Sequence, residues 1–124
     1  MKINLGCGKR NFGKDWIHID GGDYEHLHSK DIRKLPLEDG VADLIYASHV
    51  IEYFDREEIV PILKEWHRVL KPDGILRLAV PDFAVMAKLY ETNHSHCDDH
   101  SQAYLPHMDK NNGILISLNV ECAK

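Results

Sequence analysis

Residues 2–8 read KINLGCG, a short apolar strand that runs directly into two glycines around one small residue. Glycines at such a turn let the backbone bend tightly and approach a ligand, because no Cβ stands in the way. A Gly-x-Gly pair alone is weak evidence, since a simple strand-to-helix turn has the same pattern. The rest of the chain decides whether this turn belongs to a ligand-binding sheet.

Strand and helix patterns alternate from residue 2 to about residue 91, which is typical of a parallel sheet with crossover helices. We expect strands over 2–5, 16–20, 41–48 and 74–80, a weaker one around 27–32, and a second helix over 83–91. The clearest helix should begin after Asp55, where Glu58 completes a capping box. Pro61 should kink that helix or end its first turn. The sequence therefore predicts an α/β fold with a Rossmann-like, doubly wound and mostly parallel sheet.

The chain changes character after Glu91. Residues 92–112 are polar and rich in His and Asp, and residues 113–120 (GILISLNV) predict one more strand. That strand could cover the edge left open by the strand over 74–80, either within the chain or by exchange with a partner. An open edge of this kind favours a homodimer.

Composition indicates one domain over 1–124, with 44% apolar and 28% charged residues. The net charge of -5 argues against nucleic acid or anionic membrane as a main partner. No apolar stretch approaches the roughly 18 residues of a membrane span. Because the sequence opens directly in an expected strand, we expect no signal peptide. The three cysteines, Cys7, Cys97 and Cys122, are not at zinc-ligand spacing, so we expect reduced thiols and a cytoplasmic location.

Asp20 ends the second expected strand. Ligands of open parallel sheets bind outside the carboxyl ends of the strands, where a carboxylate can accept both hydroxyls of a ribose. The alternative is an ordinary turn or helix-capping aspartate.

The spacing after the glycine pair separates classes of ligand. A dinucleotide fingerprint has a third glycine, but Asn11 stands at that position, and only seven residues lie between Gly8 and Trp16. A crossover of that length holds about two helical turns. This favours a ligand with a ribose but no diphosphate, and leaves an NAD-dependent oxidoreductase as a distant alternative. A P-loop is excluded, because no Gly-Lys-Ser/Thr follows the glycines.

Five segments in order resemble the motifs of class I S-adenosylmethionine-dependent methyltransferases, and the closest branch is the small, type 11-like one that begins NLGCG. The resemblance covers residues 2–90, and the tail over 91–124 diverges from it. The segments are 4–8 (NLGCG), 16–20 (WIHID), 31–37 (DIRKLPL), 42–53 (ADLIYASHVIEY) and 66–80 (WHRVLKPDGILRLAV).

The resemblance implies S-adenosyl-L-methionine as the cofactor and methyl transfer to a small-molecule acceptor. It places Asn4, Gly6, Cys7 and Gly8 at the amino-acid part of the cofactor, Asp20 at the ribose, and Asp31 with Ile32 at the adenine. Ser48 and His49 would border the methyl group. His49 is also the best-placed candidate for a general base, with Glu52, Tyr53 and Asp82 behind it.

The chain departs from this family in ways that keep a second function open. Asn4 stands where many relatives carry an acid, Tyr53 replaces a common histidine, and only 34 residues follow Tyr90, so the C-terminal strands are reduced. The alternative is a catalytically incomplete S-adenosylmethionine-binding module. The segment 94–107 contains His, Cys and Asp, but its spacing matches no defined metal site, so we expect none.

Overall fold

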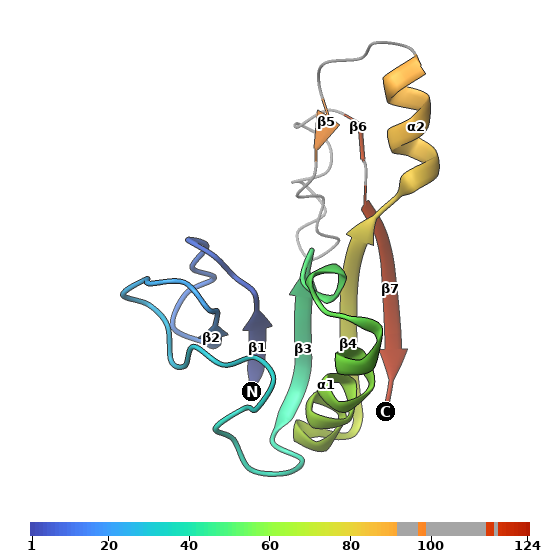
Figure 1. Cartoon of the computed structure of the whole chain (residues 1–124). Helices are drawn as coiled ribbons and strands as arrows, with labels where there is room; N and C mark the ends of the chain where they lie inside the picture. The colour runs from blue at the N-terminus through green and yellow to red at the C-terminus, as the bar shows by residue number, and fades with distance from the viewer. Residues whose placement is uncertain (92–96, 99–113, 116) are drawn as a thin grey trace.

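The computed structural model describes residues 1–91, 97–98, 114–115 and 117–124. Its centre is a five-stranded sheet with the strand order β2-β1-β3-β4-β7 (Figure 1). The first four strands are mutually parallel and β7 is antiparallel to β4, which confirms the α/β fold with a mostly parallel sheet. The strands are β1 (Lys2–Leu5), β2 (Trp16–Ile19), β3 (Ala42–Ser48), β4 (Leu70–Pro81) and β7 (Ser117–Ala123).

One long helix covers the apolar face of this sheet. The helix α1 (Arg56–Val69) begins after Asp55, whose N–H donates to the Glu58 carboxylate over 3.1 Å, and it continues through Pro61. Ile62, Trp66 and Val69 are buried in one cluster with strand residues such as Ile3 and Ile45. The expected helix over 83–91 is α2 (Phe83–Glu91), and a short 3-10 turn, η1 (Ile51–Tyr53), follows β3.

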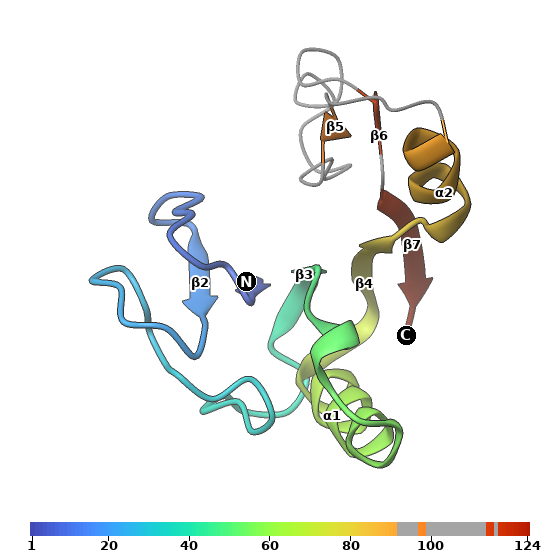
Figure 2. The same cartoon turned by 45° about the horizontal axis from the view of Figure 1, so that its top comes forward.

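A small pair of strands lies apart from the central sheet. The strands β5 (Cys97–Asp98) and β6 (Ile114–Leu115) are parallel to each other. Figure 2 shows this pair and α2 beyond the end of the sheet where β4 finishes, on the opposite end of the molecule from α1. The segment 94–107 falls largely outside the described residues, apart from the two residues of β5.

The predictions of two elements next to β2 are wrong. Residues 6–15 form turns rather than a short crossover helix, and residues 27–32 form a loop with a single bridge, Ser29 to Ile19, instead of a strand. The loop is polar and supplies few strand-forming side chains. It still runs beside β2, since the Asp20 N–H donates to the Ser29 carbonyl over 3.2 Å and the His28 N–H to the His18 carbonyl over 2.8 Å. The loop therefore caps the outer edge of β2.

The strand expected over 74–80 begins earlier, because β4 starts at Leu70, directly after α1. Leu70 is paired with Ala42 and Ile75 with Leu44, so the residues between them bulge out of the ladder. Asp73 takes a positive φ of 64° in this bulge. The segment Lys71-Pro72-Asp73-Gly74 thus forms a bulge inside one strand.

The expected C-terminal strand covers the edge of β4 from within the same chain. It begins later than expected, at Ser117, and its register runs from Pro81 opposite Ser117 to Ile75 opposite Ala123. Of the two arrangements left open by the sequence, the structure has the intramolecular one. In the described part of the chain, no helix is long and apolar enough to cross a membrane.

Helix α1 also fixes the loop that leads into β3. Arg68 donates to the carboxylates of Glu65 and Asp39 and to the carbonyls of Leu35 and Leu37. Its hydrogen bond to Glu65 lowers the pKa of that carboxyl. The indole N–H of Trp66 donates to the carbonyl of Ile32 over 2.8 Å. The apolar face of α1 thereby holds Ile32 at the carboxyl end of the sheet.

Candidate functional site

The glycine turn at the end of β1 has the backbone that the sequence predicts. Gly6 and Gly8 both have positive φ, 64° and 53°. A Cβ on Gly6 would lie 2.3 Å from Cγ2 of Val50, whereas a Cβ on Gly8 would meet nothing within 4 Å. Gly6 is therefore required for packing against the segment after β3, and Gly8 keeps the space above the turn open.

Asp20 joins two backbone turns through its carboxylate. Oδ2 accepts from the N–H of Gly8 and Oδ1 from the N–H of Gly22, each over 2.7 Å. This confirms that Asp20 has a role in the turns. A carboxylate that accepts two hydrogen bonds still has lone pairs for further ones. Asp20 is half-buried, so ligand hydroxyls can reach those lone pairs.

His49 follows β3 in an unusual conformation and is held on both ring nitrogens. Its φ is 54°, a region that few non-glycine residues occupy. Nδ1 lies 3.2 Å from Oε1 of Glu52 and Nε2 lies 2.7 Å from Oγ of Ser117 in β7. With the Nδ1 proton directed at Glu52, Nε2 accepts from the Ser117 hydroxyl. The imidazole is thus oriented by a carboxylate, as a general base requires.

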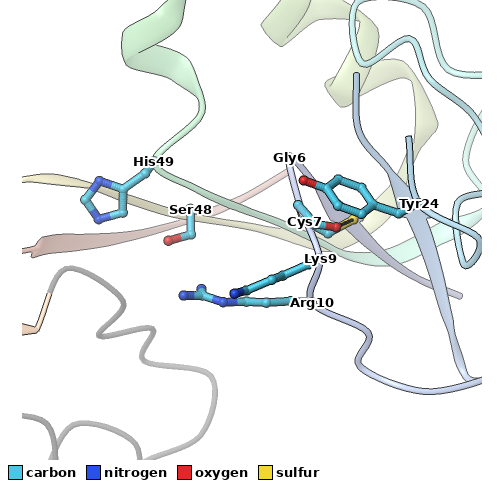
Figure 3. A pocket seen from close by; sticks show the side chains of 8 residues that line it. Gly6, Cys7, Lys9, Arg10, Tyr24, Ser48 and His49 are labelled. Atoms are coloured by element: carbon cyan, nitrogen blue, oxygen red, sulfur yellow. Dashed lines mark hydrogen bonds between the residues drawn. The ribbon is translucent and has the colours of Figure 1, made fainter. Parts of the chain in front are cut away.

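Two adjoining cavities lie along the carboxyl ends of β1, β2 and β3. We call the first the Asp20 lobe; its volume is about 490 Å³, and Asp20, Gly21 and Ile32 belong to its wall. The second, the Arg10 lobe, has a volume of about 350 Å³, and Cys7, Lys9, Arg10 and Ser48 belong to its wall (Figure 3). Both lobes share four residues: Gly6, Gly8, Tyr24 and His49.

The lobes bring together most of the residues expected at the cofactor. Gly6, Cys7, Gly8, Asp20, Ile32, Ser48 and His49 all line one lobe or both. Asn4 lines a smaller cavity of about 20 Å³ that adjoins the turn. Asp31 lines neither lobe, because its side chain is exposed and its carboxylate accepts from the N–H of Arg33 over 2.8 Å.

Several lining residues were missed by the sequence analysis. Lys9 and Arg10 line the Arg10 lobe, and their position directly after the glycine pair was a usable signal. Val50 and Phe54 line the Asp20 lobe, beside Tyr53, which the sequence analysis names only as a reserve candidate for the base. Tyr24 lines both lobes from the loop after β2, and no pattern in the sequence marks it. Asp82, a reserve candidate for the base, instead caps α2 by accepting from the amides of Ala84 and Val85.

Cys7 is a packing residue rather than a nucleophile. Its side chain is buried, and Sγ lies 3.6 Å from Nε2 of His26. Burial, with the nearby negative charge of Asp20, raises the pKa of the thiol to about 11. The thiol stays protonated at neutral pH, so it offers the site a small uncharged wall. Among the described residues, no three His, Cys, Asp or Glu side chains gather as metal ligands.

Comparison with known proteins places this site in a family. The fold resembles that of a protein from Pyrococcus horikoshii, with a TM-score of 0.61 and 21% identity over 82% of this chain and 58% of that one. A SAM-dependent methyltransferase of Methanosarcina mazei has a TM-score of 0.57 and 19% identity over 73% of this chain and 57% of that one. A SAM-dependent methyltransferase from Aquifex aeolicus has a TM-score of 0.51 and 17% identity over 65% of this chain and 56% of that one.

The chain therefore spans less than two thirds of the length of these structures. A comparison with curated protein sequences finds no match. The decisive match is a family model described as a methyltransferase domain, which covers residues 5–78, from the end of β1 into β4. By this match over more than half of its length, the chain belongs to the methyltransferase domain family.

Proposed function

We propose that this chain binds S-adenosylmethionine across the two lobes and transfers its methyl group to a small-molecule acceptor. The observation that carries the proposal is the convergence of the glycine turn, Asp20 and His49 on one continuous space at the carboxyl ends of three parallel strands. Ligands of open α/β sheets bind at this edge. In the proposal Gly6 and Gly8 face the amino-acid part, Asp20 the ribose, and Ile32 the adenine.

The residues present suit such a ligand. Each lobe lies within the range of about 300–1,000 Å³ of small-molecule sites. The open space over Gly8 admits a ligand against the backbone. Asp20 offers acceptor lone pairs to vicinal hydroxyls, and Ile32, Val50 and Phe54 supply an apolar wall for a flat ring.

S-adenosylmethionine supplies a methyl group that is already activated on a positively charged sulfur. The chain's own task is to hold an acceptor in line with that group and to exclude water, and such positioning is worth up to ~7–11 kcal/mol in favourable models. With the cofactor bound, the acceptor would form a bond to the methyl carbon as the sulfur–carbon bond broke, and the electrons of that bond would return to sulfur. Where the acceptor carries a proton, Nε2 of His49 receives it after giving up the hydrogen bond from the Ser117 hydroxyl, and Glu52 stabilises the resulting imidazolium.

Two alternative functions, a binding module and an oxidoreductase, are weighed against this proposal. The second candidate is a binding module that holds the cofactor without transferring its methyl group, since the residues that line the two lobes suit a bound ligand whether or not an acceptor follows it. An NAD-dependent oxidoreductase is disfavoured, because residues 6–15 form turns and no helix N-terminus stands after the glycines to bind a pyrophosphate. The proposal places the protein in the cytoplasm, since Cys7 and Cys122 are both free thiols.

Ligand-dependent unfolding tests the proposal. Thermal unfolding is followed with S-adenosylmethionine, S-adenosylhomocysteine, NAD and ATP, each at the same concentration. We expect only the two adenosyl compounds to stabilise the fold, by about 2.7 kcal/mol at 100 times the dissociation constant. Stabilisation by NAD alone, or by none of the four, contradicts the proposal. Stabilisation without methyl transfer to any member of an acceptor library identifies the binding module.

A further inference from the structure

The strand β7 forms the outer edge of the central sheet. It pairs with β4 on one side, and no strand of the described residues pairs with its other side (Figure 1). The N–H of Lys124 donates to the carbonyl of Gly74 on β4 over 3.0 Å, in step with the register of the two strands. Backbone groups of an antiparallel strand point alternately to its two sides, so Asn119 and Glu121 direct their N–H and carbonyl groups away from β4. This edge therefore offers backbone donors and acceptors to a further strand.

The features that usually protect a sheet edge are missing from β7. Natural edges are commonly blunted by proline, by lysine, by a bulge or by a very short strand. Neither proline nor lysine occurs in Ser117–Ala123, and the seven residues pair with β4 without a shift in register. The one charged residue of the strand, Glu121, already forms an ion pair with Arg77 of β4. The edge is thus long and regular, and its charge is neutralised within the chain.

One face of β7 is apolar. Leu118, Val120 and Cys122 alternate along the strand and share one face of the sheet. This is the face that α1 covers, because Val120 and Cys122 pair with Leu78 and Leu76, which pack against the core cluster. At the edge, however, Leu118 is 53% exposed and Val120 is 39% exposed. A neighbouring strand with apolar side chains on the same face would cover part of this surface.

We propose that a second copy of this chain binds at this edge, with its β7 antiparallel to the first, so that the two central sheets become one continuous sheet. This inference does not depend on the proposed function. In a two-fold dimer, residue i lies opposite residue j and j opposite i, so the residue on the axis sets the register. With Val120 on the axis, the two strands pair along the whole of Ser117–Ala123. Because Ser117 also contacts His49, the interface lies on the strand that reaches the cleft.

The register centred on Val120 suits both the backbone and the side chains. Asn119 lies opposite Glu121 of the second copy, and since both direct their backbone groups outward, the two residues exchange both N–H···O bonds. Val120 lies opposite Val120, and Leu118 lies opposite Cys122, so the apolar face continues across the axis. A register centred on Glu121 would instead place two carboxylates opposite each other, which is destabilising. The side chains of β7 are therefore complementary to a second β7.

Sedimentation equilibrium of the full chain tests the dimer. The variants are Val120→Lys and Val120→Glu, and the matched control is Val60→Lys on α1, where the valine is 56% exposed. We expect the wild type and Val60→Lys to dimerise. Each Val120 variant should raise the dissociation constant of the dimer at least tenfold, because like charges meet on the axis.

Mixing the two variants separates repulsion on the axis from misfolding. An equimolar mixture of Val120→Lys and Val120→Glu should restore a dimer, because opposite charges then face each other. A monomeric wild type, or a dimer that Val120→Lys leaves intact, overturns the inference. So does a mixture that stays monomeric although circular dichroism shows both variants folded.

Disulfide cross-linking tests the register. Leu118 and Cys122 of the second copy form a non-hydrogen-bonded pair, whose Cα atoms lie about 4.5 Å apart, within the range of about 4.4–6.8 Å that a disulfide spans. Diamide, which takes up the two thiol hydrogens, should therefore convert Leu118→Cys into a covalent dimer. Addition of Cys122→Ser should abolish the cross-link, and the wild type should not form it. No cross-link in Leu118→Cys, or one that persists after Cys122→Ser or forms equally in the wild type, overturns the proposed pairing.

Discussion

Nε2 of His49 and Oγ of Ser117 are 2.7 Å apart, although 68 positions separate the two residues in the chain. Ser117 is the first residue of β7 and is buried, and His49 follows β3 with a positive φ. The tail that diverges from the family pattern thus covers the edge of β4 and also supports the imidazole at the cleft. The C-terminal strand thus contacts a residue that lines both lobes.

This contact predicts an energetic coupling between the two side chains. Urea unfolding of Ser117→Ala, His49→Ala and the double variant should give a coupling of about 0.5–1.5 kcal/mol, the usual worth of a hydrogen bond. The matched control pairs Ser117→Ala with His67→Ala, a histidine of α1, and should be additive. A coupling of zero for His49 and Ser117 would mean that β7 does not hold the imidazole in solution.

The two glycines of the turn should differ sharply when replaced by alanine. Gly6→Ala meets Val50 at 2.3 Å and has a φ of 64°, so it should lose roughly 1–2 kcal/mol for the left-handed backbone and a further ~1–3 kcal/mol for overpacking. Gly8→Ala meets nothing within 4 Å and should pay only the backbone cost. Urea unfolding measures both. Val50→Ala should lower the free energy of unfolding less in the Gly6→Ala background than in the wild type. Equal losses of unfolding free energy for Gly6→Ala and Gly8→Ala would refute the packing argument.

Asp20 should contribute to both stability and ligand binding, because its oxygens hold the amides of Gly8 and Gly22. Asp20→Ala leaves the N–H groups of Gly8 and Gly22 without acceptors. Each should lower the free energy of unfolding by about 1–3 kcal/mol if it stays buried. Asp20→Asn keeps one acceptor and should lose less stability, yet still bind S-adenosylhomocysteine at least tenfold more weakly. Urea unfolding and calorimetry separate the two effects, with the exposed Asp15→Asn as the control. Undiminished ligand binding by Asp20→Asn would leave Asp20 a turn residue only.

Local patterns were enough to predict most of the elements. Strands β1, β2 and β3 lie within one residue of their expected bounds, because each is an apolar run that glycine or a polar turn limits. Helix α1 was predictable from its apolar face and from Glu58, and α2 from its position after Pro81. That the glycine turn and Asp20 line one cleft was predictable, because strand ends in a parallel sheet converge on one edge.

Long-range contacts account for what the sequence did not reveal. The loop over 27–32 has a strand-like length, but the polar side chains of His28 and Ser29 let it cap β2 instead of pairing along it. Nothing local indicates that Tyr24 turns back over both lobes, or that Ser117 meets His49. Such contacts depend on the register of distant segments, which a single sequence does not encode in any short pattern.

The histidines beside β2 should make the fold sensitive to acid. His18 is 1% exposed, and burial, with the neighbouring imidazoles of His26 and His28, lowers its pKa below the ordinary 6.5. Nε2 of the His18 ring accepts a hydrogen bond from the backbone N–H of Phe12. The backbone N–H of His18 donates to Nδ1 of His28 over 3.1 Å. Protonation of Nε2 of His18 would break its hydrogen bond from Phe12.

The sign of the pH dependence follows from this lowered pKa. Below pH 6.5 the unfolded chain binds a proton on His18 before the folded chain does, so stability is complete above pH 6.5 and is lost as the pH falls through the lower, folded-state pKa. Urea unfolding between pH 8 and pH 5 should show this loss, with a slope of up to about 1.4 kcal/mol per pH unit for one proton. His18→Gln keeps a hydrogen-bonding side chain that does not titrate and should flatten the profile, whereas His67→Gln on α1 should leave it unchanged. An identical slope in His18→Gln would assign the acid sensitivity to other groups.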